Sequence, residues 1–346
     1  MSGTTAIAVS GGIDSLVAAY LLKRQDDQVF AIHFLTGYEK PTPNGSPTIA
    51  EHCRQLDLPL VVVDIASSFR RLVVDYFCAA YRNGKTPNPC LVCNPNIKFG
   101  VLFEKARQSG ATRLATGHYA RVEKSAQGRW RLRKGLDARK DQSYFLARLT
   151  QEQLAGASFP LGEWTKEKVR ALAAEKGLRP MTRQESQDVC FIQDAAYADF
   201  LVRNTGMQFR PGNIVDTAGR LLGTHSGLHR FTVGQRRGIN CPAAQPYYVV
   251  RIDTENNRLV VGFRDELATD SCRVRDINWI VDVPGQALAV DTRIRYRHRA
   301  AASVVTPIGE DRALVRFDAP QDAVTPGQGA VFYRGDEVIG GGWIEG

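Results

Sequence analysis

The chain has 346 residues, of which 43% are hydrophobic, and carries a formal net charge of +9. This length is typical of roughly two to three domains, and the positive charge favours a polyanionic partner. The N-terminus lacks the basic start and apolar core of a signal peptide, and no apolar run approaches the ~18 residues of a membrane span. We therefore expect a cytoplasmic protein without membrane association. Its seven cysteines then indicate thiol reactivity or metal binding rather than structural disulfides.

The first half of the sequence alternates short apolar runs with helical patterns. Strands are predicted over 5–9, 29–34, 60–65 and 113–117, and helices over 16–22, 48–58 and 97–109. In the last of these helices, Lys98 and Lys105 are expected to face outward. Val- and Ile-rich strands separated by helices predict a doubly wound parallel sheet. Ligands bind such sheets beyond the carboxyl ends of the strands, where the sequence places Asp14, Phe34, Asp64 and Gly117-His118.

The second half changes character. Residues 129–133 are predicted to form one edge of a hairpin, and 150–177 two helices that are separated near 159–162, the second capped by Thr165. After about residue 200, Pro-Gly pairs and short β-branched runs predict small β-rich units, the last a barrel. We expect an α/β domain with a helical extension over 1–200, a central β-rich domain over 201–272 and a C-terminal β-barrel over 273–346.

The segment Ser10-Gly11-Gly12-Ile13-Asp14-Ser15 lies at the first predicted strand–helix junction. The N–H groups and dipole of a helix N-terminus favour an anion, the glycines allow close approach, and the serines offer hydroxyl donors. No Lys follows the second glycine, which excludes a Walker A loop. An ordinary glycine turn is the alternative, but the complete hexapeptide favours nucleotide binding. It resembles the PP-loop of ATP pyrophosphatases, which split ATP into AMP and pyrophosphate; this resemblance implies that Asp14 helps to hold magnesium.

Two cysteines lie in Thr86–Asn94, where prolines and asparagines predict a rigid loop rather than a helix. Cys90 and Cys93 could be half of a zinc site, although no second pair accompanies them; they could be a redox pair, or buried packing, which so polar a loop disfavours. Cys190, in a Val-Cys-Phe-Ile run, is either a small apolar core residue or a reactive thiol. The others are interpreted as structural: Cys53, Cys78, Cys241 and Cys272.

Basic residues cluster in the β-rich half. Arg293, Arg295, Arg297 and Arg299 alternate with other residues, so on a strand they would share one face. A solvated face is the simpler interpretation. Together with the basic segments 234–238 and 134–140, the pattern favours a track for RNA phosphates.

Eight segments occur in the order found in the tRNA-specific 2-thiouridylases (MnmA, or TrmU in mitochondria), which this chain resembles over nearly its whole length. They are SGGIDS, NPCLVCNPNIKFG, ATGHYAR, GLDARKDQSYFL, SQDVCFI, GQRRG, RIRYRHR and TPGQ. That family replaces the C2 oxygen of the wobble uridine of certain tRNAs with sulfur. The resemblance implies ATP and Mg²⁺ as cofactors, tRNA as substrate, and a cysteine desulfurase or sulfur-relay protein as persulfide donor. We also expect a monomer that acts on one tRNA.

The resemblance also implies roles for individual residues. Cys93 matches the nucleophile and Cys190 the persulfide carrier. The ATP site corresponds to Ala8, Val9, Ser10, Gly11, Gly12, Ile13, Asp14 and Ser15, with Phe34 against the adenine and a second contact at Gly117. Contacts with tRNA are implied for Asn88, Pro89, Cys90, His118, Lys140, Asp141, Gln142, Arg295, Tyr296 and Gln328.

One position departs from the family pattern. The family commonly has Asp, a candidate general acid or base, where this chain has Cys90. Cys90, Cys93 and Cys190 also match the ligand count of a [4Fe–4S] cluster with one open iron, so the alternative is a cluster-dependent tRNA thiolase. Two rivals share the glycine loop. A PP-loop synthetase would not need the cysteines or the basic β-rich half, and the intact loop disfavours an RNA-binding protein without activity.

Overall fold

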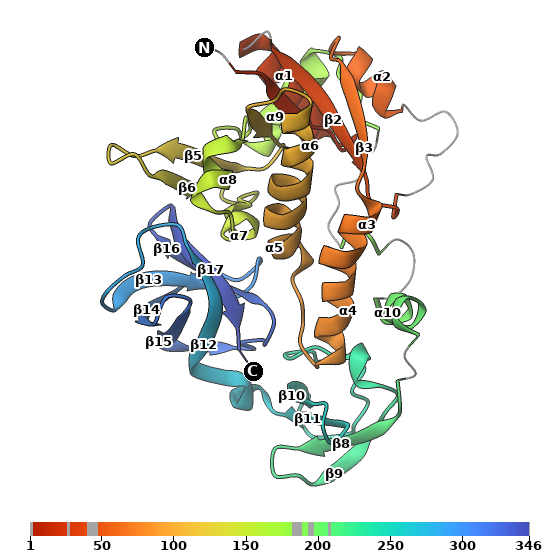
Figure 1. Cartoon of the computed structure of the whole chain (residues 1–346). Helices are drawn as coiled ribbons and strands as arrows, with labels where there is room; N and C mark the ends of the chain where they lie inside the picture. Colours follow the sequence, from red (N-terminus) through yellow and green to blue (C-terminus); the bar gives the residue numbers. More distant parts are fainter. Residues whose placement is uncertain are drawn as a thin grey trace. The chain divides into compact units, whose positions relative to one another are not determined.

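The computed structural model describes residues 3–25, 28–39, 48–181, 189–192, 197–206 and 209–345. The chain forms two compact units, whose helices and strands are labelled in Figure 1. The first unit comprises Met1–Val73, Cys90–Gln193 and Gly335–Ile339, and the second Val74–Pro89, Asp194–Arg334 and Gly340–Gly346. Among the described residues, no helix is both long and apolar enough to cross a membrane.

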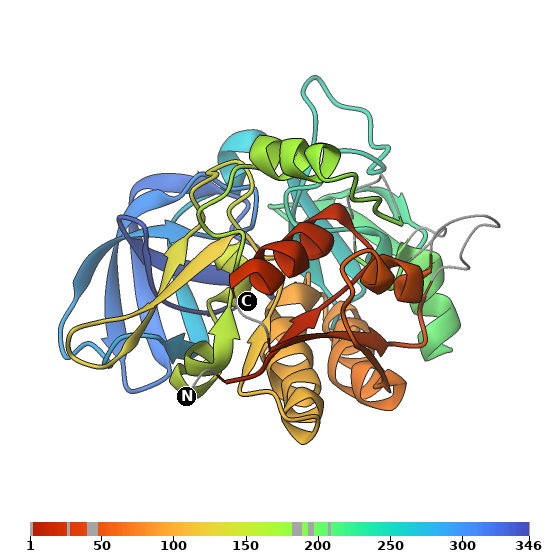
Figure 2. The ribbon, with the colours of Figure 1, turned by 90° about the horizontal axis from the view of Figure 1, so that it is seen from above.

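The first unit contains a five-stranded parallel sheet in the order β3-β2-β1-β4-β7. Its strands are β1 (Thr5–Ala8), β2 (Val29–Leu35), β3 (Leu60–Asp64), β4 (Arg113–Ala115) and β7 (Ala157–Ser158). Figure 2 shows α1 (Ile13–Gln25) on one face of this sheet and the helix over residues 94–108 on the other. The predicted doubly wound parallel sheet is confirmed, and β7 extends it by a strand that the sequence did not predict.

The centre of this sheet is buried on both faces, as the continuous apolar run of β1 requires. Ala6 and Ile7 are fully buried, and Leu16 and Val17 of α1 pack in the same core. The core also contains Val169 from α9 (Lys166–Glu175). This packing fixes the start of α1 against the sheet, and with it the glycine loop that precedes the helix.

Threonine caps begin three helices of this unit. Thr48 and Thr150 form capping boxes at α2 (Ile49–Arg54) and α8 (Gln151–Gly156), and the Thr165 hydroxyl accepts a hydrogen bond from Lys168 N at α9. The predicted hairpin edge is also present, because β5 (Ala120–Lys124) pairs antiparallel with β6 (Trp130–Lys134). The remaining short helices of this unit are α3 (Ala66–Phe69), η1 (Arg70–Val74) and α7 (Ser143–Leu146), whereas α4 (Asp75–Arg82) belongs to the second unit.

The predicted rigid loop around the two cysteines is wrong, because that segment starts a helix. α5 (Pro89–Cys93), the π-helical η2 (Asn94–Leu102) and α6 (Phe103–Gln108) follow one another with helical dihedrals at both junctions. Proline fits the first turn of a helix, where its missing N–H has no intrahelical acceptor. In η2, the Cβ of any residue at Gly100 would lie 2.9 Å from Pro95 O, so the backbone there requires glycine.

The second unit begins its β-rich part with a four-stranded sheet in the order β10-β11-β8-β9. The elements are α10 (Tyr197–Thr205), β8 (Gly212–Asp216), β9 (Leu221–His225), η3 (Leu228–Arg230), β10 (Tyr248–Asp253), β11 (Arg258–Gly262) and η4 (Arg264–Leu267). Its core is formed by Ile214, Val249, Leu259 and Val261. The prediction of a small central β-rich domain is confirmed.

The C-terminal strands close into a six-stranded antiparallel barrel, because neighbouring strands follow the order β12-β15-β14-β13-β16-β17 and β17 pairs back with β12. They are β12 (Ala268–Trp279), β13 (Leu288–Arg293), β14 (Ala301–Ile308), β15 (Arg312–Asp322), β16 (Gly329–Arg334) and β17 (Glu337–Ile344). Closure leaves the barrel without an unpaired edge. The predicted barrel is confirmed.

The prediction that four arginines share one face of a strand is wrong. β13 ends at Arg293, and the chain then turns, with His298 N donating to Arg295 O at 3.0 Å. The Arg293 Nε–H donates to His298 O at 3.0 Å, which closes the turn from its other side. The alternation of basic and other residues resembles a strand pattern, but these local hydrogen bonds favour the turn.

Candidate active site

The glycine loop lies between β1 and α1, and its own side chains close it. The Ser15 hydroxyl donates to Gly12 O at 2.9 Å and accepts from Ser10 N at 3.2 Å. Gly11 has a φ of +81°, and a Cβ there would lie 2.6 Å from the sulfur of Met181, whose N–H donates to Gly11 O. The loop is therefore fixed in a conformation that glycine alone adopts without strain. Such a loop at a helix N-terminus suits a phosphate.

Asp14, in the first turn of α1, is held by two side chains from other parts of the unit. The Lys166 ammonium contacts both carboxylate oxygens, at 2.7 and 2.8 Å, and the Tyr119 hydroxyl donates to Oδ1 at 2.7 Å. Lys166 is almost fully buried, with 7% of its side chain exposed, whereas 33% of the Asp14 side chain is exposed. A buried ammonium thus lies beside the loop, paired with one carboxylate that still reaches solvent.

The expected role of Asp14 in holding magnesium against the phosphates of ATP stays a prediction. Both carboxylate oxygens are occupied by the Lys166 ammonium. Among the described residues, no group of three His, Cys, Asp or Glu side chains is placed to hold a metal ion. The cation that the fold itself supplies at this position is Lys166.

The carboxyl ends of the central strands meet at the same edge of the sheet. Gly117 follows β4, and a Cβ on it would lie 3.0 Å from Asp14 C and from Ser15 N. The backbone after β4 therefore lies directly against the glycine loop. Phe34, at the end of β2, is half-buried and pairs in register with Val63. The structure thus places Gly117 beside the loop, while a contact of Phe34 with adenine stays a prediction.

The two cysteines of the CxxC segment lie one helical turn apart. Cys90 and Cys93 are both in α5, and residues three apart lie on the same face of a helix. Cys90 is exposed and Cys93 is half-buried, and both are free thiols. The helix therefore presents two thiols together, which the predicted loop would not have required.

Lys98 links this helix to the end of β4. Its ammonium lies 3.3 Å from His118 Nε2, and His118 Nδ1 lies 2.6 Å from Thr116 Oγ1. Burial lowers the pKa of His118 well below its usual range, and the positive charge of Lys98 lowers it further. The imidazole is therefore neutral: Nε2 accepts from Lys98, and Nδ1–H donates to Thr116. The prediction that Lys98 faces outward is wrong, since the side chain is half-buried on this histidine.

Electrostatic interactions join Lys98 to three thiols. Burial raises the pKa of Cys93 to about 12, and Lys98 opposes this rise while the thiols of Cys190 and Cys90 add to it. The protein packed around Cys90 raises its pKa to about 11, with a further rise from Cys190 and a lowering by Lys98. The pKa of Cys190 is raised by burial and lowered by Lys98. Because Lys98 lowers the pKa of each of these thiols, we refer to Cys90, Cys93 and Cys190 together as the thiol cluster.

Cys190 is exposed, and its position is set by the residue that follows it. The Phe191 ring is buried between Phe69 and Tyr38, with ring centroids 5.8 and 6.0 Å away. Ile192 N donates to Val189 O at 3.0 Å, which closes a turn around the thiol. Residues 186–188 of the same motif lie outside the described residues. Cys190 is thus a surface thiol on an anchored turn, and its interpretation as a core residue is wrong.

The thiol cluster does not fit the predicted iron–sulfur alternative. Cys90, Cys93 and Cys190 are all among the described residues, and they are not arranged as a set of three metal ligands. The four cysteines interpreted as structural lie elsewhere. Cys53 and Cys78 are buried, and Cys241 and Cys272 are half-buried.

Comparison with known proteins decides the family. Residues 4–194 match the tRNA methyl transferase HUP domain, 198–263 the tRNA methyl transferase PRC-barrel domain, and 269–344 the aminomethyltransferase beta-barrel domain. The tRNA-specific 2-thiouridylase MnmA of Desulfosudis oleivorans is 54% identical over 98% of this chain and 94% of the relative. That of Geotalea uraniireducens is 46% identical over 98% and 94%. The chain belongs to the tRNA-specific 2-thiouridylase family.

One solved structure is far more distant than these 2-thiouridylases. The U34-tRNA thiolase NcsA from Methanococcus maripaludis, with its [4Fe-4S] cluster, matches 58% of this chain and 67% of its own at 21% identity. The TM-score is 0.37. This likeness is too low to support an argument about the site.

Some of the residues that the resemblance assigns to tRNA binding form hydrogen bonds within the protein. The buried Asp141 carboxylate accepts from the N–H groups of Gly135 and Ser143, at 3.2 and 3.0 Å, and Gln142 Oε1 accepts from Tyr119 N at 3.0 Å. Lys140 is half-buried. These contacts hold the segment against Tyr119, and its binding to tRNA stays a prediction.

Gln328 of the barrel contacts the chain that leads into the thiol helix. Its Nε2 donates to Thr86 O at 3.0 Å, two residues before the half-buried Asn88. Pro89 is buried and is the first residue of α5. In the barrel turn, Arg295 is exposed, Tyr296 is half-buried, and the Arg293 guanidinium lies 5.6 Å from the Tyr296 ring centre. Contacts of these residues with tRNA likewise stay predictions.

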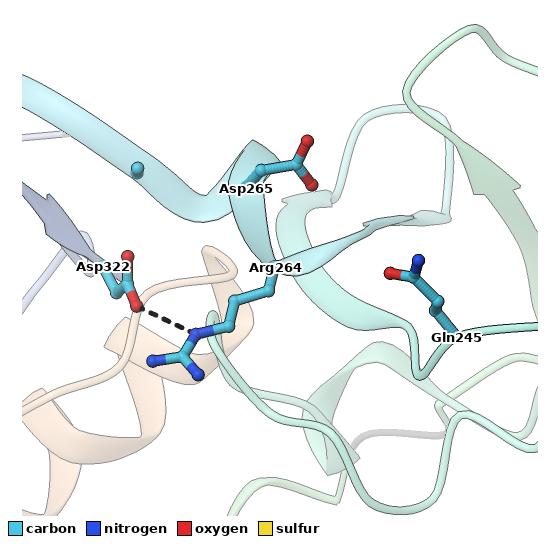
Figure 3. Close-up of a pocket in the computed structure, with 5 residues that line it drawn as sticks. Gln245, Arg264, Asp265 and Asp322 are labelled. Atoms are coloured by element: carbon cyan, nitrogen blue, oxygen red, sulfur yellow. Dashed lines mark ion pairs between the residues drawn. The ribbon is translucent and has the colours of Figure 1, made fainter.

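A recess of about 480 Å³ in the second unit is open to solvent and is lined by none of the predicted site residues. Figure 3 shows Arg264 and Asp322 there, joined by an ion pair of 3.5 Å, with Asp265 and Gln245 nearby. Arg264 and Asp322 in this recess are already paired with each other, so the recess is not the candidate active site.

Sequence reasoning missed three residues of the site. Lys166 and Tyr119 hold Asp14, and Lys98 contacts His118 and lowers the pKa of the three thiols. Lysines in helices are usually exposed, so Lys98 carried no local signal. A lysine directly after the capping Thr165 is the single hint, because the first turn of a helix is an unusual place to bury an ammonium.

Proposed function

We propose that the protein is a tRNA-uridine 2-sulfurtransferase, which converts the wobble uridine of tRNA to 2-thiouridine and releases AMP and pyrophosphate. One observation supports this most strongly: residues 116–119 contact both halves of the site. Gly117 lies against the backbone of Asp14, and the Tyr119 hydroxyl donates to its carboxylate. His118, held by Thr116, contacts Lys98, which lowers the pKa of the thiols. One short segment thus contacts the nucleotide loop with some of its residues and leads to the thiols through others. This arrangement suits ATP-dependent sulfur insertion.

The first chemical step is activation of the uridine. The C2 oxygen attacks the α-phosphorus of ATP, the bond to the bridging oxygen breaks, and pyrophosphate leaves. The oxygen, which is a poor leaving group, is then an ester of AMP. The N–H groups of the loop at Ser10–Ser15 and the Lys166 ammonium are the groups of this chain that would stabilise the phosphate charge.

Sulfur then arrives from a persulfide on Cys190, by one of two routes. In the first, the terminal sulfur attacks C2, AMP leaves, and the Cys93 thiolate attacks the Cys190 sulfur, leaving the thiocarbonyl on the base. In the second, Cys93 attacks the inner sulfur first and releases hydrosulfide, which attacks C2 and displaces AMP, leaving the thiocarbonyl on the base. Both routes leave a Cys93–Cys190 disulfide. Two electrons from a reductant restore the thiols.

The substrate side of the proposal rests on charge. The chain carries +9, and Arg295, Arg297 and Arg299 are exposed in one barrel turn. An anticodon base must leave its stack to reach the loop and the thiols. We propose ATP with Mg²⁺ as cofactors, a cysteine desulfurase or sulfur-relay protein as persulfide donor, cytoplasmic location and action as a monomer. The domain boundaries near residues 200 and 272 belong to the same proposal.

Nucleoside mass spectrometry tests this function. Purified protein is incubated with unmodified tRNA, ATP and a persulfide donor, such as a cysteine desulfurase with free cysteine, and the digested tRNA is searched for 2-thiouridine. We expect 2-thiouridine with ATP and none without it, together with AMP and pyrophosphate. Cys190→Ala should abolish persulfide-dependent product, while Cys241→Ala, which removes a half-buried thiol of the central domain, should not. ATP cleavage without 2-thiouridine would overturn the proposal.

A further inference from the structure

The thiol cluster contains one more thiol than the proposed reaction uses. Cys93 and Cys190 account for sulfur delivery and for the disulfide that remains. Cys90, which stands where the family commonly has Asp, is also a free thiol in the same cluster. The negative charge of the Cys190 thiolate raises the pKa of Cys90, and that of the Cys90 thiolate raises the pKa of Cys93. A thiol next to a disulfide that forms in every turnover is placed to exchange with it.

The helix sets Cys90 and Cys93 at a separation that a disulfide can bridge. Both lie in α5, three residues apart. With a rise of 1.5 Å and 100° per residue, their Cα atoms are about 5 Å apart. Disulfides join Cα atoms that are about 4.4–6.8 Å apart. The helix therefore fixes the distance between the Cα atoms of Cys90 and Cys93, which a loop would not fix.

We propose that Cys90 is a resolving thiol that moves the disulfide away from Cys190 after each sulfur transfer. The Cys90 thiolate attacks the Cys93 sulfur of the Cys93–Cys190 disulfide. A Cys90–Cys93 bond forms, the Cys93–Cys190 bond breaks, and Cys190 leaves as a thiolate. The exchange consumes no electrons. An external dithiol then reduces Cys90–Cys93 by two electrons.

This assignment deepens the proposed function and rests on it. Cys90 is the exposed member of the pair and Cys93 the half-buried one, so a reductant reaches the disulfide at Cys90. Freed Cys190, also exposed, accepts the next persulfide sulfur while the other two cysteines are still oxidised.

Disulfide mapping after one turnover tests the assignment. Protein loaded with persulfide is mixed with tRNA and ATP without reductant, free thiols are blocked by alkylation, and peptides are identified by mass spectrometry under non-reducing conditions. We expect a Cys90–Cys93 disulfide and an alkylated Cys190 in the unaltered protein. Cys90→Ser should instead retain Cys93–Cys190. With a dithiol present, its steady-state rate relative to its first-turnover rate should fall about tenfold.

The outcomes separate this inference from the proposed function. If 2-thiouridine forms and the unaltered protein retains Cys93–Cys190 with Cys90 alkylated, the resolving role is overturned while the function stands. If neither 2-thiouridine nor a disulfide forms, the proposed function fails first. Cys241→Ser is the matched control, because it removes a half-buried thiol from the central domain and should leave both the disulfide map and the rate ratio unchanged.

Discussion

The hydroxyl of Tyr119 donates a hydrogen bond of 2.7 Å to Oδ1 of Asp14. The residue before it, His118, lies 3.3 Å from the ammonium of Lys98. Adjacent residues thus hold a carboxylate at the nucleotide loop and a cation at the thiols. Because both are fixed by the same short segment after β4, displacement of that segment would disturb both halves of the site.

Replacement of Lys166 tests the cation at the loop. Lys166→Met removes the ammonium that contacts both oxygens of Asp14. We expect kcat/KM for ATP, measured as tRNA-dependent pyrophosphate release, to fall about 100-fold. Lys166→Arg should recover part of the loss. Lys168→Met, which removes an exposed lysine of the same helix, is the control. An unchanged kcat/KM in Lys166→Met would show that Lys166 has no role in using ATP.

Gly117 tests the close approach behind the loop. The new Cβ of Gly117→Ala would lie 3.0 Å from backbone atoms of Asp14 and Ser15, which cannot move independently of α1. We expect the free energy of unfolding to fall by about 1–3 kcal/mol, with weaker ATP binding, measured by urea titration and calorimetry. Gly285→Ala has no atom within 4 Å of its Cβ and should change neither quantity. Equal behaviour of the two variants would contradict the packing argument.

Lys98 tests the electrostatics of the thiol cluster. The ammonium lowers the pKa of Cys93 against the effect of burial, so Lys98→Met should raise that pKa and reduce the thiolate fraction. Below the pKa, one unit corresponds to a tenfold change in thiolate. We expect alkylation of Cys93 by iodoacetamide at pH 8, followed by peptide mass spectrometry, to slow about tenfold. Lys105→Met alters an exposed lysine further along the same helix and should leave the rate unchanged; a faster rate in Lys98→Met would contradict this assignment.

His52 makes stability depend on acid. Burial lowers its pKa to about 4, whereas in the unfolded chain it is about 6.5. Between these values the unfolded state binds the extra proton, so stability falls as the pH decreases through this range. From pH 7.5 to pH 5 the loss from this residue is about 2 kcal/mol. His52→Met should reduce the difference in unfolding free energy between these pH values by that amount.

Urea titration at both pH values measures this effect. Gln55→Met is a suitable control, because Gln55 follows the same short helix and contacts Arg179 but does not titrate. It should lower stability equally at pH 7.5 and pH 5. An unchanged pH dependence in His52→Met would mean that the ring is accessible to protons in the folded state.

The barrel turn should carry part of the tRNA affinity. Arg295→Ala should weaken tRNA binding and leave ATP binding intact, because the side chain is exposed and far in sequence from the loop. If the guanidinium contacts one phosphate, the slope of log K against log salt should decrease by about 0.7–0.9. Binding is measured by fluorescence anisotropy between 50 and 300 mM salt, roughly the range in which phosphate contacts dominate. Arg312→Ala, which alters an exposed arginine of the same barrel, is the control. Equal salt slopes in the two variants would contradict the assignment of Arg295 to tRNA binding.

The sequence was sufficient for four of the five strands of the parallel sheet and for the glycine loop. The buried strands and the glycine hexapeptide are local patterns, and each predicted its element without reference to distant residues. The thiol helix was missed because Pro89 was weighed as a helix breaker, although a first turn tolerates it. The strand at Arg293–Arg299 was predicted from alternation alone, while hydrogen bonds to His298 favour a turn.

The partners of the functional groups were harder to predict than the groups themselves. Asp14 and Lys166 are 152 positions apart in sequence and meet at 2.7 Å. Lys98 was assigned to the outer face from α-helical spacing, but η2 is π-helical, so residues five apart rather than four are bonded and the faces change. Such contacts depend on the packing of several elements, which no single segment encodes.

The wide turns of η2 have a consequence for chain length. α5 carries two thiols at one end of the helix, and α6 packs in the core of the first unit at the other. Deleting one residue between them would rotate one end of the helix relative to the other. Cys90 and Cys93 would then leave the side on which Lys98 and His118 meet, although every residue of the site would still be present. The number of residues in this helix therefore sets the direction in which the thiols point.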